Sequence, residues 1–307
     1  ARAEPLFREH TPTDAPRTVV YPFGGGDLLG AITTYPNATE YTTLSLEPTG
    51  DPRGARGLEP ATLARGLFAL RQIMNGLLTV QDSKTVNLAA AARGILPGQL
   101  GFFLTALAIH GYEPVALSYF HLASDGSVVY YTADELSRVP AQRVAGMPPR
   151  EFANAELRFR RAGDPSSTPR VHRHIAANLD DERVASDPSV LRHLEAKGTV
   201  AALTKAASYL LWWTSFSRVR GYLLGHARVM FSDSTGIPPA EALPAGYELT
   251  TFGRFAGPFL HQRSRTTRDL AALWRVQPYR PLRFRYRYPD SEGHNHMMRL
   301  ARTTRAR

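Results

Sequence analysis

The sequence contains no cysteine, and this absence excludes several kinds of chemistry at once. A chain without thiols forms no disulfide and offers no thiolate ligand to zinc or to an iron–sulfur cluster, and it has no cysteine nucleophile. Lysine is almost as scarce, since only three of the 37 basic residues are lysine. We attribute this preference for arginine, together with the many Ala, Gly and Pro residues, to a GC-rich genome rather than to a functional demand for guanidinium groups.

Long uncharged stretches are also rare, and only one of them approaches the length of a membrane span. Residues 94–112 contain no Asp, Glu, Lys or Arg. A membrane helix needs about 20 predominantly apolar residues, and here Gly and Pro interrupt the first half of the stretch. We therefore predict a buried helix over residues 102–109 and no transmembrane segment.

The charge that is present is distributed unevenly along the chain. Residues 1–249 contain 24 basic and 24 acidic residues, whereas residues 250–307 contain 13 Arg and three acidic residues. The whole formal charge of +10 therefore lies in the C-terminal part. This asymmetry indicates an anionic partner. We expect an acidic protein or an anionic membrane surface, and not nucleic acid.

The order of the predicted elements indicates an α/β fold. A strand at residues 18–23, a glycine turn, a short helix and a strand at residues 41–46 begin the chain in a Rossmann-like way, and later hairpins add further strands. We predict a Rossmann-like mixed sheet flanked by helices over residues 18–288. An extended arm over residues 1–17 precedes it, and a basic, mobile tail over residues 289–307 follows it.

Two further assignments concern the second half of the chain. The apolar residues from about 199 to 216 are interpreted as a largely buried helix. Residues 283–288, in which Arg alternates with aromatic residues, are predicted to form a strand.

The turn after the first strand is the first candidate site. Gly24, Gly25 and Gly26 precede Asp27 at the start of a helix, where backbone N–H groups can bind phosphate or carboxylate. Glu47 ends the second strand, at the position where an acidic residue meets a ribose hydroxyl in a dinucleotide site. The alternative is a tight strand-to-helix turn that binds no ligand.

Residues 24–48 resemble the opening of Rossmann-like S-adenosylmethionine methyltransferases. In that family a glycine loop followed by Asp opens a helix, and an acidic residue ends the next strand. The acidic residue that the family carries in its first strand is missing, because Tyr21, Pro22 and Phe23 occupy that stretch. An exported protein would also lack access to this cofactor, so we expect no bound cofactor.

A broader resemblance extends over most of the chain. It is carried by residues 21–27, 35–38, 46–48, 205–210 and 233–238. These segments resemble signatures of a family of uncharacterised exported bacterial proteins. The resemblance implies an α/β fold and a place in the periplasm or cell envelope, but no known activity. The first three residues, Ala1-Arg2-Ala3, have the small-x-small pattern found near signal-peptidase sites, which agrees with export.

A second turn, at Asp233 and Ser234, follows a predicted strand. Loops at strand ends commonly carry functional side chains, and in a Rossmann-like sheet the carboxyl ends of the strands converge. We therefore group Asp233 and Ser234 with Asp27 and Glu47 as candidate catalytic residues of a hydrolase or transferase. The alternative is that Asp233 only hydrogen-bonds to its own turn.

His172 and His174 are the candidate metal ligands. They lie two residues apart on a predicted strand, so their side chains face the same side of the sheet. Imidazole pairs of this kind bind zinc or copper. The alternative is a pair of histidines with no ligand, and we leave the metal open.

The last candidates are arginines. Arg283, Arg285 and Arg287 would lie on one face of the predicted C-terminal strand, where they could bind phosphate, carboxylate or lipid headgroups, and Arg299 and Arg302 add to them in the tail. The alternative is an outer strand with solvated arginines. We favour an exported binding or assembly protein that uses this Arg-rich region, with an enzyme built around the glycine turn as the second interpretation.

Overall fold

The computed structural model describes residues 3–79, 98–141, 148–205, 211–255, 264–286 and 295–302. The strands are β1 (Thr18–Tyr21), β2 (Glu40–Ser45), β3 (Tyr112–Leu122), β4 (Val128–Tyr130), β5 (Asn154–Arg161), β6 (Arg170–Ala176), β7 (Val200–Thr204), β8 (Ala227–Ser232), β9 (Tyr247–Gly253) and β10 (His296–Arg302). The helices are α1 (Glu4–His10), α2 (Leu28–Thr34), α3 (Pro60–Thr79), α5 (Leu100–Ile109), α6 (Ala133–Arg138), α7 (Asp181–Ser186), α8 (Ser189–Glu195), α9 (Ser217–His226), α10 (Pro239–Ala242) and α11 (Arg265–Val276). Short 3-10 turns occur at Pro52–Ala55, Arg150–Phe152 and Thr214–Phe216.

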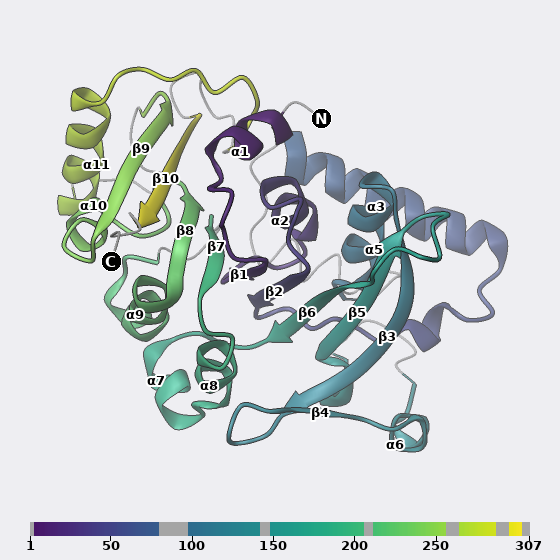
Figure 1. Cartoon of the computed structure of the whole chain (residues 1–307). Helices are drawn as coiled ribbons and strands as arrows, with labels where there is room; N and C mark the ends of the chain where they lie inside the picture. The colour runs from purple at the N-terminus through teal and green to yellow at the C-terminus, as the bar shows by residue number, and fades with distance from the viewer. Residues whose placement is uncertain are drawn as a thin grey trace.

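The strands form one sheet in the order β4-β3-β5-β6-β2-β1-β7-β8-β10-β9 (Figure 1). The central strands β6, β2, β1, β7 and β8 are parallel neighbours, and the pairs at both ends of the sheet are antiparallel. The predicted α/β sheet with flanking helices and hairpins is therefore confirmed. The sheet is mixed, as predicted, but most neighbouring pairs are antiparallel, and the Rossmann-like part of the prediction stays a proposal.

Both faces of the central strands are buried. On β1, Val19 packs in a core with Leu28 of α2 and Phe103 of α5, and Val20 packs in a second core with Leu194 of α8 and Leu223 of α9. Successive side chains of a strand point to opposite faces, so each strand contributes to both cores. This is why β1 and β7 are almost entirely apolar rather than alternating.

The N-terminal segment is not an extended arm, and the prediction for residues 1–17 is wrong for α1. Pro5 lies in the first turn of this helix, where the missing N–H and the fixed φ of proline are tolerated. Phe7, only 2% exposed, packs against Phe231 with ring centroids 4.9 Å apart and against Phe284 at 5.6 Å. One aromatic side chain thus docks the segment on the core.

The C-terminal segment is not a tail over its described part. Residues 295–302 carry β10, which pairs with β8 on one side and β9 on the other. Met297, Met298 and Leu300 are fully buried because an inner strand has both faces covered. In contrast, residues 281–286 form no strand, and residues 287–294 of the predicted strand and tail lie outside the described residues.

The predicted helix over residues 199–216 is also wrong at its start, because residues 200–204 are the central strand β7. The predicted helix over residues 102–109 is confirmed as α5. None of the helices within the described ranges is long and apolar enough to cross a membrane.

Candidate functional site

The strand order reverses next to β1. From β1 the chain passes to β2 and β6 on one side, and β7 and β8 lie on the other side. In open α/β sheets, ligands bind outside the carboxyl ends of the strands at such a reversal. Asp27 follows β1, Lys205 follows β7, and Asp233 follows β8. We call Asp27, Lys205 and Asp233 the switch-point group.

Asp27 is held by its own turn. One carboxylate oxygen, Oδ1, accepts a hydrogen bond from the Gly30 N–H at 2.8 Å and caps helix α2, and Oδ2 accepts one from the Tyr21 hydroxyl at 3.2 Å. Burial raises the pKa of this carboxyl, and the nearby Lys205 ammonium opposes the rise. A carboxyl with a raised pKa is suited to proton transfer near neutral pH.

Tyr286 connects the members of the switch-point group. The Lys205 ammonium lies 5.2 Å from the centroid of the Tyr286 ring. The phenol is 6% exposed and its hydroxyl has no hydrogen-bond partner among the described residues. Burial, and then the charges of Asp233, Tyr35 and Asp27, raise its pKa well above the ordinary value. The charges of Asp27 and Asp233 therefore both act on the phenol of Tyr286.

Sequence reasoning did not find Tyr286 or Lys205 as site residues. Tyr286 was interpreted as one of the core aromatics of a strand, and Lys205 was placed inside a helix. Both come to the site through the fold. The only available signal was that Lys205 is one of three lysines in the chain and directly follows an apolar run.

Asp233 hydrogen-bonds to its own turn, as the alternative interpretation held. Its Oδ1 accepts from the Thr235 N–H at 2.7 Å and from the Thr235 hydroxyl. Ser234 is 3% exposed, and its N–H donates to Nε2 of His296 at 3.3 Å. The Ser234 hydroxyl has no partner among the described residues, so none of them serves as its general base.

The glycine turn is packed by protein atoms. A Cβ on Gly24 would lie 2.7 Å from the Tyr21 ring, and a Cβ on Gly26 would lie 2.5 Å from the Gln99 amide oxygen. Gly25 has a φ of 49°, in the left-handed region that glycine adopts without strain. The three glycines are thus explained by the tightness of the strand-to-helix turn, and their binding role stays a proposal.

Glu47 and Gln99 are buried polar side chains for which the described residues provide no hydrogen bond or ion pair. Glu47 is 5% exposed, yet its carboxylate makes no hydrogen bond or ion pair with any residue in the described ranges. Gln99 is fully buried, and neither atom of its amide has a partner there. The Gln99 N–H donates to the Pro48 carbonyl at 3.1 Å, which holds the two side chains on adjacent segments. Buried polar groups normally have hydrogen-bond partners, so the Gln99 amide is an exception among the described residues.

His172 and His174 face the same side of β6, as predicted, but both are buried. They share the Thr43 hydroxyl, at 2.9 Å from His172 Nε2 and 3.0 Å from His174 Nδ1, and His174 Nε2 lies 2.7 Å from the Glu47 carbonyl. Burial lowers the pKa of both, that of His174 to about 4. Within the described part of the chain, no group of three His, Asp or Glu side chains could hold a metal ion.

The candidate arginines do not form one surface. Arg283 and Arg285 are exposed, with Phe284 and Tyr286 turned inward between them. Arg299 is half-buried and donates to the His10 carbonyl at 3.2 Å, and Arg302 donates to the Leu224 and Gly225 carbonyls. Arg287 lies outside the described residues. Arg299 and Arg302 thus stabilise the fold, because β10 brings them into the sheet.

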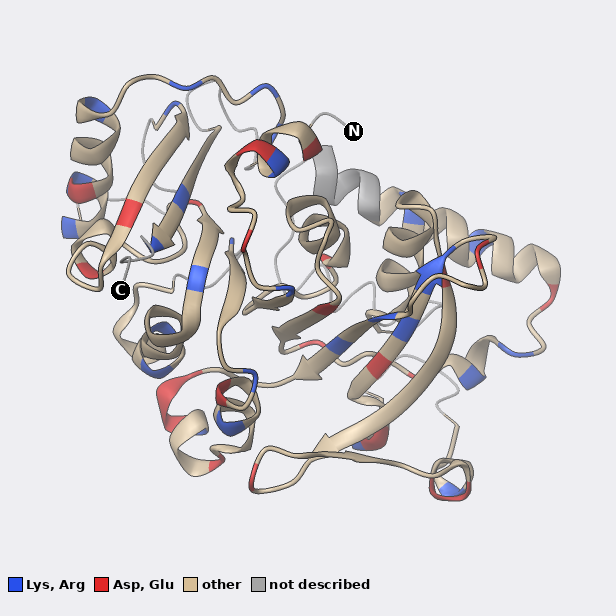
Figure 2. Ribbon diagram, viewed as in Figure 1, with Lys and Arg blue, Asp and Glu red and all other residues tan. Residues whose placement is uncertain are grey.

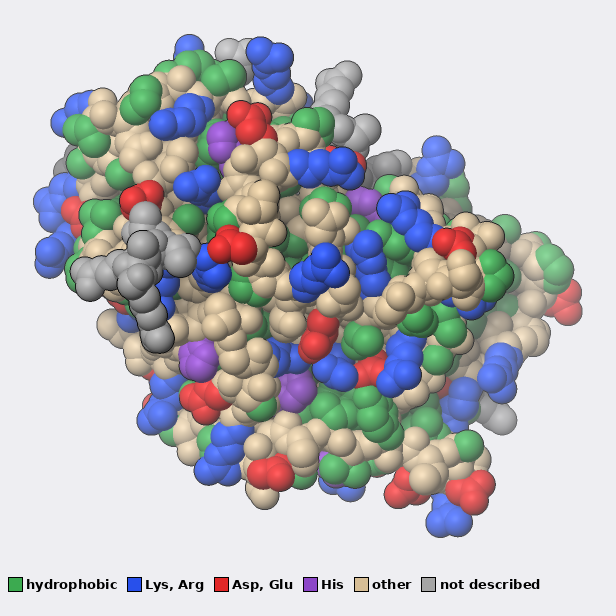
Figure 3. All heavy atoms as spheres, viewed as in Figure 1, with side chains coloured by type: hydrophobic (Ala, Val, Ile, Leu, Met, Phe, Trp, Pro, Cys, Tyr) green, Lys and Arg blue, Asp and Glu red, His purple; other side chains and the backbone are tan. Residues whose placement is uncertain are grey.

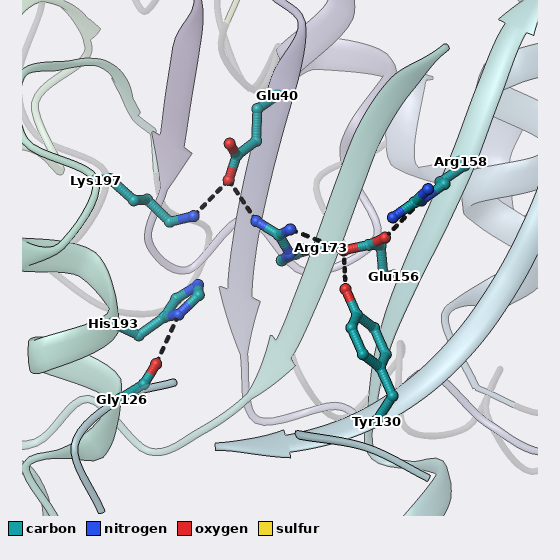
Figure 4. Close-up of polar contacts among 8 residues, drawn as sticks. All are labelled: Glu40, Gly126, Tyr130, Glu156, Arg158, Arg173, His193 and Lys197. Carbon is teal, nitrogen blue, oxygen red and sulfur yellow. Dashed lines mark hydrogen bonds and ion pairs between the residues drawn. The ribbon is translucent and has the colours of Figure 1, made fainter. Parts of the chain in front are cut away.

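A second polar cluster lies on the face of the sheet covered by α8 (Figure 4). Glu40 accepts from Lys197 at 2.5 Å and from Arg173 at 2.8 Å, and Arg173 also contacts Glu156 at 2.8 Å. Glu156 further accepts from the Tyr130 hydroxyl at 2.5 Å. These contacts lower the pKa of both carboxyl groups despite their burial. Each charged side chain of this cluster has a partner of opposite charge. We therefore assign the cluster a structural role rather than a catalytic one.

No protein-family model, curated protein or solved structure matches this chain. Its function therefore has to be argued from the site itself.

Proposed function

We propose that this protein is an enzyme, a transferase or hydrolase, that binds a nucleoside-type ligand at the switch point between β1 and β7. The observation that carries the proposal is the Glu47 carboxylate, which is buried at the end of β2 and unpartnered among the described residues. An acidic residue at this position is suited to accept hydrogen bonds from ribose hydroxyl groups.

The order of the parallel strands supports this proposal. Counted along the chain, β6-β2-β1-β7-β8 run in the order 3-2-1-4-5, which is the order of the first five strands of a dinucleotide-binding sheet. Residues 24–48, which resemble the opening of Rossmann-like methyltransferases, form the turn after β1, helix α2 and strand β2 of this arrangement. The proposal concerns the parallel centre of the sheet alone, since its ends are antiparallel.

The side chains present divide the work of such a site. Glu47 and the Gln99 amide would orient the ligand, because both have unused hydrogen-bonding capacity. Asp27, with its raised pKa, would move a proton at Oδ2, and the neighbouring Lys205 ammonium would stabilise negative charge that develops next to it.

Exchange of Glu47 for Gln tests the proposal. We expect wild-type protein to bind adenosine or S-adenosylmethionine in isothermal titration calorimetry, and E47Q to bind the same probe at least about 10-fold more weakly, since a hydrogen bond to a charged group contributes roughly 1.5–3 kcal/mol. E59Q, on an exposed glutamate, is the matched control and should bind as the wild type does.

The stability of E47Q distinguishes a ligand-binding role from a structural one. Glutamine has nearly the same size as glutamate, and the exchange breaks no contact with a residue in the described ranges, so the melting temperature should stay unchanged. The proposal is wrong if neither probe binds to the wild-type protein, or if E47Q binds with wild-type affinity.

A second candidate function is association with an anionic partner. Arg283 and Arg285 favour it, because both are exposed on the loop after α11 and this loop has no acidic residue over residues 278–286. We keep this as a proposal for a surface that is separate from the switch-point group.

A further inference from the structure

A cleft of about 760 Å³ opens beside the carboxyl end of β6. The β3–β4 hairpin, the segment leading into β5, and helix α7 form its walls. None of the switch-point group is among the described residues that line it. Small-molecule sites typically enclose about 300–1,000 Å³, so this cleft has the size of a ligand site.

In the two asparagine side chains of the cleft, the amide oxygen accepts a hydrogen bond, whereas the NH₂ group donates none to a described residue. Asn154 Oδ1 accepts from the Ala176 N–H at 2.9 Å, and Asn178 Oδ1 accepts from the Asp180 N–H at 3.0 Å. Each backbone contact fixes which end of the amide is oxygen. Each therefore leaves an NH₂ group, which can only donate, for a ligand.

Two guanidinium groups add to these donors. Arg183 forms no side-chain hydrogen bond and no ion pair with any residue that the structure describes, and it lines the cleft. The Arg150 guanidinium contacts Glu151 at 3.3 Å, and the Arg150 side chain is 92% exposed. The acidic side chain of the lining, Asp187, already accepts from the Ser189 N–H at 3.1 Å. Asp187 keeps its charge, so the described lining carries two guanidinium groups and one carboxylate and is net positive, which matches an anion.

The remaining wall carries two aromatic rings and apolar side chains. The rings of His121 and Tyr131 have centroids 5.1 Å apart, and both line the cleft. The buried side chains of Ile175 and Val184 continue the apolar surface. A ligand with a planar, apolar body would cover these side chains while its charged end faces the arginines.

We propose that this cleft binds a small organic anion with a planar body, whose carboxylate or phosphate group is held by Arg183 and Arg150 and whose body packs on Tyr131 and Ile175. The inference does not depend on the proposed function, because the two sites share no residue.

Calorimetric titration with phenyl phosphate and with benzoate tests this site and distinguishes a phosphate from a carboxylate. We expect at least one of the two probes to bind, and phenol, which lacks the charge, to bind far more weakly. R183Q should weaken binding of that probe at least about 10-fold, since it removes charge-assisted hydrogen bonds. R65Q changes the same charge on the exposed face of α3, outside the cleft, and should have no effect.

A second variant keeps the test independent of folding. N178D retains an oxygen for the Asp180 N–H but replaces the donor by a carboxylate, so it should also weaken anion binding. Both variants should melt at the wild-type temperature, because Arg183 and Asn178 are exposed. Absence of binding by both probes, phenol binding as tightly as the anions, or wild-type affinity in R183Q would each overturn the proposal.

Discussion

Single buried histidines make the stability of this protein depend on pH. His193 is 7% exposed, its Nδ1 lies 3.0 Å from the Gly126 carbonyl, and its Nε2 has no partner among the described residues. Burial, together with the charge of Lys197, lowers its pKa to about 4. The ordinary value is about 6.5. The unfolded chain therefore binds a proton at mildly acidic pH while the folded chain does not, and stability falls as the pH falls from about 6.5 to 4.

The exchange His193→Asn tests this linkage, because asparagine can keep a donor toward Gly126 but does not titrate. Between pH 7 and pH 5 we expect the unfolding free energy of the wild type to fall by about 2 kcal/mol more than that of H193N. Urea unfolding at the two pH values measures the difference. Equal losses in the two proteins would contradict the assignment.

His172 and His174 show what a pattern within a few residues can predict and what it cannot. The spacing of His172 and His174 correctly predicted that they face the same side of the sheet. It could not show that this side is covered by Phe103, whose ring lies 4.4 Å from that of His172. Burial depends on a helix far away in the sequence, so the sequence left open whether the pair binds a metal.

At the scale of elements, the last strand decides whether the sheet forms. β10 is bonded to β8 and β9 along its length, and its buried side chains belong to both cores. Loss of a single buried Met or Leu side chain costs roughly 2–5 kcal/mol, and whole domains are stable by about 5–15 kcal/mol.

Truncation after Asn295 should therefore prevent folding, whereas truncation after Arg302 should not. Far-UV circular dichroism and urea unfolding distinguish the two, since the shorter chain should show no cooperative transition. Cooperative unfolding of the chain that ends at Asn295 would contradict this prediction.

Helices and strands whose ends are marked by turn or capping residues were predicted, whereas a strand without such residues or a clear period was not. The β1-α2-β2 opening was predicted because a glycine turn and the capping Asp27 mark its boundaries. β7 was missed because an apolar strand that is buried on both faces has no period to distinguish it from a buried helix. For the same reason Lys205 was predicted to lie in a helix, whereas it directly follows β7.

At the scale of the whole molecule, the fold disperses the charge that the sequence concentrates. In Figure 2, Lys and Arg occur throughout the ribbon, and on the face in Figure 3 they lie among acidic and hydrophobic side chains. The reason is that β10 returns to the sheet next to β8. Of the candidate arginines in the described part of the chain, Arg283 and Arg285 are exposed, and we propose them as the contact for an anionic partner.

Flotation with phosphatidylserine-containing vesicles tests that surface. Each basic residue near an anionic membrane contributes about 1 kcal/mol, so the variant R283E/R285E should bind at least about 30-fold more weakly. R65E/R71E, the same charge change on exposed positions of α3, is the matched control. Equal loss in both variants would point to net charge alone, and no binding by the wild type would remove the membrane as the partner.

The sequence by itself determined the α/β class, the β1-α2-β2 opening and the absence of thiol chemistry, since these follow from composition and from patterns within a few residues. Only the tertiary structure decided that Asp27, Lys205 and Tyr286 lie together, that Glu47 is buried with no hydrogen bond or ion pair to its carboxylate from the described residues, and that β10 is an inner strand. These features depend on which strands become neighbours, and strand pairing joins residues that are distant in the chain through contacts that no local pattern encodes.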